Sequence, residues 1–271
     1  MAVTYEWTPD PTAAQPGRGA VVLSCFPSAG LATTVAAHYM VQALGLPRVG
    51  VFESADSMPL AIVQSGQVQP PIRVYGRPDL AIVVSEFPQS MEGVGGLAGA
   101  ILAGAERMPA KIVLAIEGVV PHPTDDGEEG AAAADPATLP EEQVWSVPAK
   151  NDASLLEQFK RAKTRPLGDG VIGGVSGALL VRGLRSSVPV GALLVSARNE
   201  GYPDHRAGAA LIEAIDRLFP EVKIDTGPLR TQAEIIERAL RAAMRTQKSG
   251  GRAGNATGPP APSADTQSIY Q

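Results

Sequence analysis

The sequence holds one cysteine and three histidines among its 271 residues. Cys25 therefore has no partner for an internal disulfide, which excludes a disulfide framework and favours a reducing compartment. His38, His122 and His205 are far apart, and none stands beside a second His or Cys at the spacing of metal ligands. We expect no metal site on these histidines and no cofactor.

Long apolar runs and an excess of positive charge are also missing. No apolar run approaches the roughly 18 residues that a membrane-spanning helix requires, and the N-terminal segment lacks the apolar centre of a signal peptide. The formal net charge is −5, which does not attract a polyanion. We expect a cytoplasmic protein with no nucleic-acid partner and no membrane span.

The signatures of several enzyme classes are absent as well. There is no Gly-x-Ser-x-Gly elbow and no P-loop lysine. A dinucleotide fingerprint needs three spaced glycines after the first strand, and only Gly30 is present there. The sequence alone indicates no convincing active site.

The apolar pattern that is present alternates between buried strands and amphipathic helices. The longer strands are predicted at 20–26, 48–53, 80–85, 111–117 and 190–196. Shorter strands are predicted at 60–64 and 72–75, as a hairpin, and at 144–147 and 222–224. Helices are predicted at 31–44, 90–107, 154–163, 178–185, 203–219 and 231–245. This alternation predicts an α/β fold, a three-layer sandwich with a mostly parallel central sheet.

Composition divides the chain into three parts. Residues 1–19 are a Pro-rich lead-in that we expect to be flexible, and residues 20–245 are the α/β domain. Residues 246–271 are a tail of mainly Gly, Pro, Ala and Ser, which buries too little apolar surface to order itself. We therefore expect this tail to be disordered.

Within the domain, residues 121–142 form an acidic, Ala-rich insertion that we expect on the surface. A metal site is the alternative interpretation of this segment. Its clustered carboxylates do not have the spacing of a calcium loop, so the solvated interpretation is favoured: Asp125, Asp126, Glu128 and Glu129.

Two places near strand ends, where ligands bind in open α/β sheets, are candidate sites. The first runs from Ser24 to Gly30, where Cys25 is interpreted as a buried thiol rather than a nucleophile because no activating base is evident. The second runs from Asn199 to Arg206. There Glu200, Asp204 and His205 offer an acid, a base and an orienting group, but a helix cap at Asp204 is favoured.

A third candidate is the glycine cluster from Gly93 to Gly99, which is weak evidence for phosphate binding. Together these places define the alternative function. It is a phosphorylase- or hydrolase-like enzyme with a pocket at the strand ends near Ser28, Gly93 and Asp204.

The last three residues are Ile269, Tyr270 and Gln271, and they follow the Gly- and Pro-rich tail. An apolar residue, a tyrosine and a free carboxylate on a flexible tether are typical of a docking arm. An ending of this kind arises by chance in roughly one chain in a hundred.

Three segments resemble the proteasome assembly chaperone family in its single-domain archaeal and bacterial form. Phe26-Pro27-Ser28-Ala29-Gly30-Leu31, with Ala36-Ala37-His38-Tyr39-Met40 after it, resembles the opening strand, FPxAG turn and helix of that family. Gly173 to Leu180 resembles its glycine turn before a helix, and Tyr202-Pro203-Asp204 resembles the start of its later helix. The sequence departs from the family pattern at Cys25, where Gly is usual, and in the length of the acidic insertion.

The resemblance implies a three-layer α/β fold related to nucleoside phosphorylases, without their catalysis, and homo-oligomers. It also implies that the protein is not an enzyme. Several archaeal members carry a C-terminal hydrophobic-Tyr-X motif that enters pockets between α-subunits of the proteasome core particle. Ile269, Tyr270 and Gln271 match that motif, so the expected partner is the α-ring of the core particle.

Overall fold

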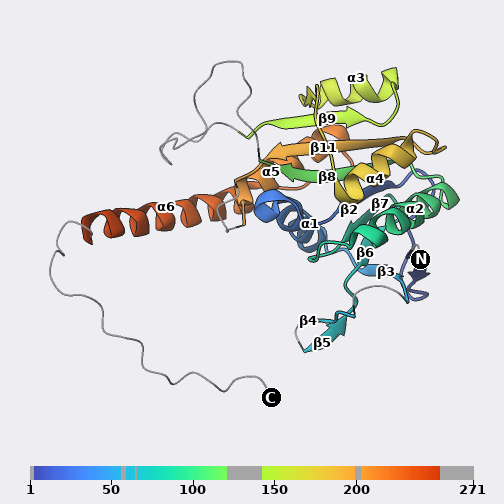
Figure 1. Cartoon of the computed structure of the whole chain (residues 1–271), viewed down its shortest axis with the longest axis horizontal. Helices are drawn as coiled ribbons and strands as arrows, with labels where there is room; N and C mark the ends of the chain where they lie inside the picture. Colours follow the sequence, from blue (N-terminus) through green and yellow to red (C-terminus); the bar gives the residue numbers. More distant parts are fainter. Residues whose placement is uncertain (1–2, 56–58, 65, 121–141, 199–202, 251–271) are drawn as a thin grey trace. The chain divides into compact units, whose positions relative to one another are not determined.

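The computed structural model describes residues 3–55, 59–64, 66–120, 142–198 and 203–250. The chain separates into two compact units, residues 1–233 and 234–271. The described part of the second unit consists of the later turns of a helix that begins in the first. The strands and helices described below are those of the first unit, and Figure 1 shows them with their labels.

The first unit is built on a nine-stranded sheet in the order β1-β3-β6-β7-β2-β8-β11-β9-β10. The centre, β7-β2-β8-β11, is parallel throughout, whereas β1, β3 and β6 add to one side as antiparallel strands and β9 pairs antiparallel with β11. The strand bounds are Glu6–Pro9 (β1), Val21–Cys25 (β2), Arg48–Glu53 (β3), Arg73–Arg77 (β6), Leu80–Val84 (β7), Ile112–Val119 (β8), Val144–Pro148 (β9), Arg165–Pro166 (β10) and Val190–Ser196 (β11).

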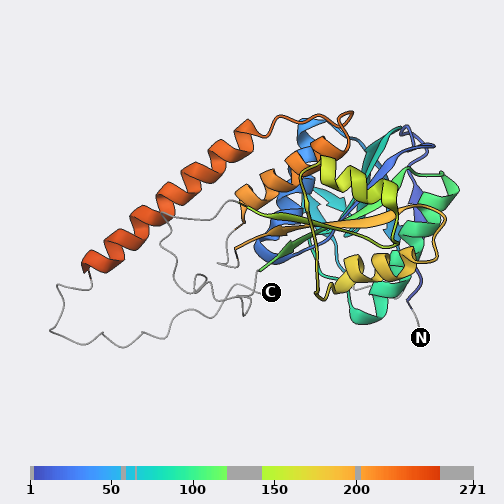
Figure 2. The same cartoon turned by 90° about the horizontal axis from the view of Figure 1, so that it is seen from above.

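Helices cover both faces of this sheet, so the predicted three-layer α/β fold is confirmed (Figure 2). One face packs against α1, α3, α5 and the start of α6, and the other against α2 and α4. The helix bounds are Ala32–Ala43 (α1), Met91–Arg107 (α2), Ala153–Arg161 (α3), Gly174–Gly183 (α4), His205–Leu218 (α5) and Gly227–Gly250 (α6).

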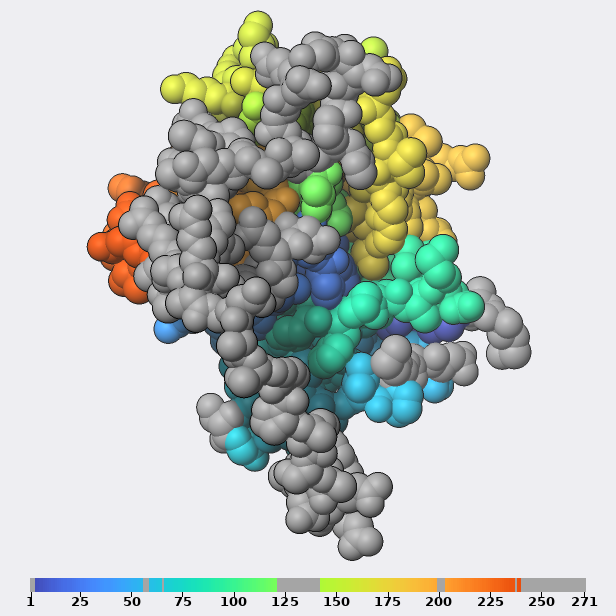
Figure 3. Space-filling view, turned by 60° about the vertical axis from the view of Figure 1, so that its left-hand side comes forward, coloured from blue at the N-terminus to red at the C-terminus, as the bar shows by residue number. Residues whose placement is uncertain are grey.

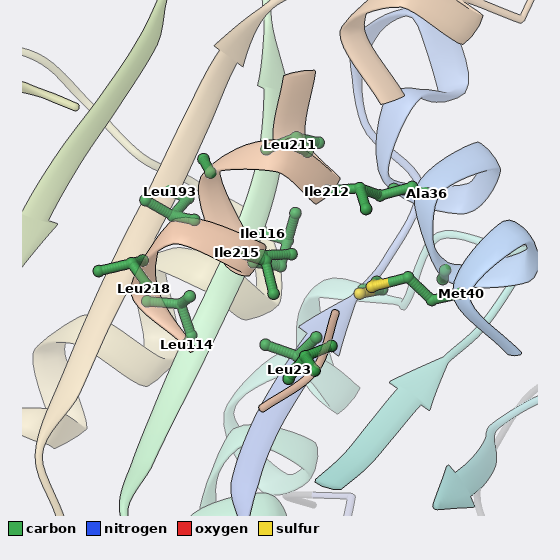
Figure 4. Close-up of a cluster of buried hydrophobic side chains, with 14 of the residues drawn as sticks. Leu23, Ala36, Met40, Leu114, Ile116, Leu193, Leu211, Ile212, Ile215 and Leu218 are labelled. Atoms are coloured by element: carbon green, nitrogen blue, oxygen red, sulfur yellow. The ribbon is translucent and has the colours of Figure 1, made fainter. Parts of the chain in front are cut away.

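Strand side chains alternate between the two cores because successive residues of a strand point to opposite faces. In β2, Leu23 points to the core under α1 and α5, whereas Val22 points to the core under α2. Helix α5 fills the first core with Leu211, Ile215 and Leu218, all at most 8% exposed (Figure 4). Because both faces are buried, the central strands read as continuous apolar runs, which made them easy to predict.

The segment expected as a flexible lead-in contains strand β1, which the sequence analysis did not predict. β1 pairs with β3, placing Trp7 opposite Phe52. Val3 and Tyr5 are buried in the core under α2. The alternation Val3, Tyr5, Trp7 is the period-two signal of a strand, and it was overlooked because prolines follow it.

The predicted hairpin of 60–64 with 72–75 is wrong in its pairing. Strand β4 (Ile62–Gln64) pairs with β5 (Gln67–Gln69) in a separate two-stranded sheet, and β6 joins the main sheet. Residues 222–224 do not form the predicted strand. The helix predicted from 178 begins earlier, at Gly174. The buried face of α1 centres on Ala36, Ala37 and Met40, and Leu31, just before the helix, is 44% exposed.

Among the described residues, no helix is long and apolar enough to cross a membrane.

Candidate functional site

The carboxyl ends of the parallel strands β2, β7, β8 and β11 lie along one edge of the sheet. The turn after β2 is the first feature of this edge. Thr33 donates to Phe26 O at 2.6 Å, and its hydroxyl is also 2.6 Å from Ser28 Oγ, so the predicted site residue Ser28 is engaged within the turn. Gly30 has a φ of 60°, in the left-handed region. Its carbonyl accepts a hydrogen bond from the Asp204 N–H at 2.7 Å.

Asp204 joins the end of β11 to the start of α5. Its carboxylate accepts from the backbone N–H of Arg198 at 3.0 Å, from the Arg198 guanidinium at 3.2 Å and from Ala207 N–H at 3.2 Å. Burial acts to raise the pKa of Asp204, but these hydrogen bonds and the positive charge of Arg198 outweigh it and hold the pKa below its ordinary value. Asp204 therefore caps α5, as the favoured interpretation of the sequence predicted.

Of the other two predicted groups of this site, His205 is the one that the structure describes. His205 lies at the first position of α5, and its Nδ1 is 3.0 Å from the Pro203 carbonyl oxygen. Glu200 lies outside the described residues. Gly93 is in the first turn of α2 beside the N-cap Ser90, close to the hydroxyl of Tyr5. The structure therefore gives Ser28, Gly93 and Asp204 local structural roles.

The thiol of Cys25 is fully buried, and burial raises its pKa to about 12. A thiol with this pKa is protonated at neutral pH and is a poor nucleophile. The interpretation of Cys25 as a small buried side chain is confirmed.

A second polar cluster follows β7. Arg73, which is 1% exposed, pairs with Glu86 and donates to Pro70 O at 2.9 Å and to the Tyr75 hydroxyl at 3.1 Å. His38 Nε2 lies 2.8 Å from the same Glu86 carboxylate. Burial acts to raise the pKa of Glu86, but His38 and Arg73 outweigh it and lower the pKa. Sequence reasoning missed this cluster because its members come from α1, β6 and the end of β7.

Glu117 is the half-buried carboxyl group of β8, and Ser176 of α4 donates to it at 2.6 Å. Burial raises its pKa to about 7, and the bond from Ser176 opposes this shift only in part. Within the described residues no group of three His, Cys, Asp or Glu side chains is placed to hold a metal ion.

We expect Glu117 to make stability fall as the pH rises from about 4.5 to 7. In this window the unfolded chain has lost the proton that the folded chain retains, so ionisation favours unfolding. Glu117→Gln removes the titration and keeps an acceptor for Ser176. Urea denaturation should show the variant more stable than wild type at pH 8, by about 2 kcal/mol, and no more stable at pH 4.5. An unchanged pH profile would contradict this assignment.

Large apolar side chains are exposed along the same edge of the sheet. Leu31 follows β2, Phe87 follows β7, Met91 begins α2 and Val120 follows β8, with exposed fractions from 37% to 86%. We call these four residues the strand-end apolar face. In Figure 3 the blue, teal and green segments that contain them meet on one side of the molecule.

Comparison with known proteins places this fold in a family. The model of the PAC2 family matches residues 22–244. The chain belongs to the PAC2 family. This membership confirms the resemblance to the proteasome assembly chaperones that the sequence analysis stated from the FPSAG turn, the glycine turn and the Pro-Asp start of α5.

Relatives in archaea share most of the chain. An uncharacterised protein of Methanocaldococcus jannaschii is 27% identical over 222 residues, which cover 82% of this chain and 84% of that protein. The crystal structure of Pyrococcus furiosus PbaA, an archaeal homolog of proteasome-assembly chaperone, superposes with a TM-score of 0.74 at 21% identity, covering 91% of this chain and 95% of PbaA. Pyrococcus furiosus PbaB, an archaeal proteasome activator, superposes with a TM-score of 0.66 at 18% identity, covering 90% and 100%.

The predicted docking residues Ile269, Tyr270 and Gln271 lie outside the described residues, as do residues 121–141 of the acidic insertion.

Proposed function

We propose that this PAC2 protein binds the proteasome core particle as an assembly chaperone or activator, and that its C-terminal tail docks into the α-ring. The observation that carries the proposal is the combination of a PAC2 domain over residues 22–244 with a chain that closes on Ile269-Tyr270-Gln271. The descriptions of PbaA and PbaB support the choice of partner.

Each of the three closing residues supplies a different kind of contact. Ile269 enters an apolar niche, and Tyr270 contributes ring area and a hydrogen bond from its hydroxyl. The terminal carboxylate of Gln271 pairs with a basic residue of the partner. The prediction that the tail begins at residue 246 is wrong, because α6 continues to Gly250; we propose that the residues after α6 act as the tether that lets this tripeptide reach the pocket.

A homo-oligomer would present several tails to one ring and strengthen a weak contact through effective concentration, by about 10² to 10⁴.

The outer side of α4 is the surface that we assign to this assembly. Val181 is 68% exposed, and Leu184, just after α4, is 57% exposed. Both line a groove of about 600 Å³ between α2 and α4. Val181→Glu should reduce the mass of the particle measured by light scattering, and an unchanged mass would exclude this surface.

The test of the docking proposal compares the wild-type protein with four variants for binding to immobilised core particle. Deletion of 269–271 and Tyr270→Ala should each weaken binding about 100-fold or more, because aromatic anchors dominate such contacts. Addition of one glycine after Gln271 should also weaken binding, since it moves the terminal carboxylate away from its partner. Ser268→Ala is the matched control and should bind as wild type does.

Undiminished binding after the deletion would refute docking through the tail. The same mixtures, assayed for hydrolysis of a fluorogenic peptide, separate the two roles. Faster hydrolysis by the core particle indicates an activator, and binding without faster hydrolysis indicates an assembly chaperone.

A further inference from the structure

An apolar cleft of about 290 Å³ lies between the sheet and the second half of α2. Its floor comes from strands β2, β3, β6 and β7 and from α2, and the buried side chains that form it are Val22, Phe52, Val74, Ala81, Val83 and Ile101. Trp7 of β1 forms one wall, and the centroid of its ring lies 5.2 Å from the centroid of the Phe52 ring. The strands and helix that surround it can be followed at the β3 side of the sheet in Figure 1.

The cleft exists because α2 carries a glycine where it faces this part of the sheet. Ile101 and Ala105 on the same side of α2 are buried, but a Cβ atom built at Gly104 would meet no atom within 4 Å. Protein interiors are normally filled to the density of organic crystals. Water finds few hydrogen-bond partners against such walls, so the space favours an apolar occupant.

A positive charge lines the otherwise apolar cleft. Arg107, in the last turn of α2, is exposed and has no ion pair or hydrogen bond to any residue that the structure describes. The other polar side chain there, Gln15, donates to the carbonyls of Asp10, Ala13 and Val49. Arg107 is therefore the group in this cleft that is able to select the charge of a ligand.

We propose that this cleft binds an amphiphilic monocarboxylate, with an alkyl chain of medium length in the cleft and the carboxylate at Arg107. The volume lies at the lower end of small-molecule pockets, which span roughly 300 to 1,000 Å³. A single guanidinium suits one carboxylate, because its fork of N–H donors matches the two oxygens. The assignment is independent of the proteasome and of the C-terminal tail.

Trp7 supplies a direct readout, because the chain contains only two tryptophans. In full-length protein with Trp145→Phe, the emission of Trp7 should change saturably on titration with decanoate below its micellar concentration. Octanoate should bind about tenfold more weakly, since it buries two fewer methylenes. Decanol should bind about fivefold more weakly than decanoate, and decyltrimethylammonium more weakly still.

Substitutions at two positions, Gly104 and Arg107, locate the ligand. Gly104→Leu fills the cleft and should abolish the decanoate response, while Tm stays the same or rises because leucine is the better helix former. Gly104→Ala should cause a smaller loss of decanoate affinity. It replaces Gly104→Leu as the test variant if the leucine perturbs folding. Arg107→Gln should weaken decanoate about fivefold and leave decanol unchanged. Lys160→Gln, in the last turn of α3 on the opposite face of the sheet, is the control and should change the affinity for neither decanoate nor decanol.

Absence of a saturable response to any probe, or full binding by a folded Gly104→Leu protein, would overturn the site. Equal affinity for decanoate and decanol, with no effect of Arg107→Gln, would overturn the assignment of a carboxylate ligand. Binding of decanoate by protein lacking 269–271 should match wild type, so the result does not depend on core-particle docking.

Discussion

Gly30→Ala should lower the free energy of unfolding by about 3 kcal/mol, and Gly45→Ala by only about 1 kcal/mol. The two glycines have nearly the same backbone, with φ of 60° and 58°. They differ in what an added Cβ would meet. At Gly30 it would lie 2.7 Å from the Arg198 carbonyl oxygen and 3.0 Å from Asp204 Cβ, whereas at Gly45 nothing lies within 4 Å.

The comparison separates two costs of replacing a glycine. Gly45→Ala measures the strain of a left-handed conformation alone, and Gly30→Ala adds the collision with the backbone before α5. Urea denaturation followed by circular dichroism measures both. Equal losses for the two variants would show that the turn after β2 moves freely away from α5, which contradicts the packing described above.

Asp204→Ala should cost about 3 kcal/mol, several times more than Asp152→Ala. Both aspartates are N-caps, and Asp152 accepts from the N–H groups of Ser154 and Leu155 at the start of α3. Asp204 is 4% exposed, and its carboxylate also accepts hydrogen bonds from the backbone N–H and the guanidinium of Arg198. Its removal leaves those donors without their carboxylate. Asp152→Ala, the matched control, should cost about 1 kcal/mol.

The pH dependence of this effect has a defined sign. The folded protein holds the pKa of Asp204 below its ordinary value of 3.8, so the contribution of the carboxylate is complete above that value. It is lost as the pH falls through the lowered pKa. The difference between wild type and Asp204→Asn should therefore shrink below about pH 4, and a difference that is constant down to pH 2 would contradict the assignment.

The elements that were predicted best are those whose signals are local. The central strands β2, β7, β8 and β11 are apolar runs bounded by turns, and the N-cap Asp204 directly precedes its helix. The elements that were missed or misplaced depend on distant partners. β1 is held by β3, about 40 residues later in the chain, and β6 pairs with β3, about 25 residues earlier, as well as with the adjacent β7.

The polar clusters show the same contrast between local sequence signals and contacts with distant residues. The cap at Asp204 was favoured from its position before a helix, but the Arg198 that neutralises it gave no sequence signal. The cluster of Arg73, His38 and Glu86 was not predicted, because its members are joined only when α1 packs beside β6 and β7. The cleft beside Trp7 is likewise a gap between five strands and a helix, and a gap leaves no pattern in a sequence.

The amino-acid pattern alone is enough to predict the α/β class, the alternation of strands and helices and the motifs by which the family is identified. These follow from the spacing of apolar residues and from turn residues that act on their immediate neighbours. Tertiary structure alone decided the order of the strands, the partners of the buried charges, the pKa of Glu117 and the position of the apolar cleft. Each of these depends on which distant segments come into contact, because burial and pairing are properties of three-dimensional neighbours.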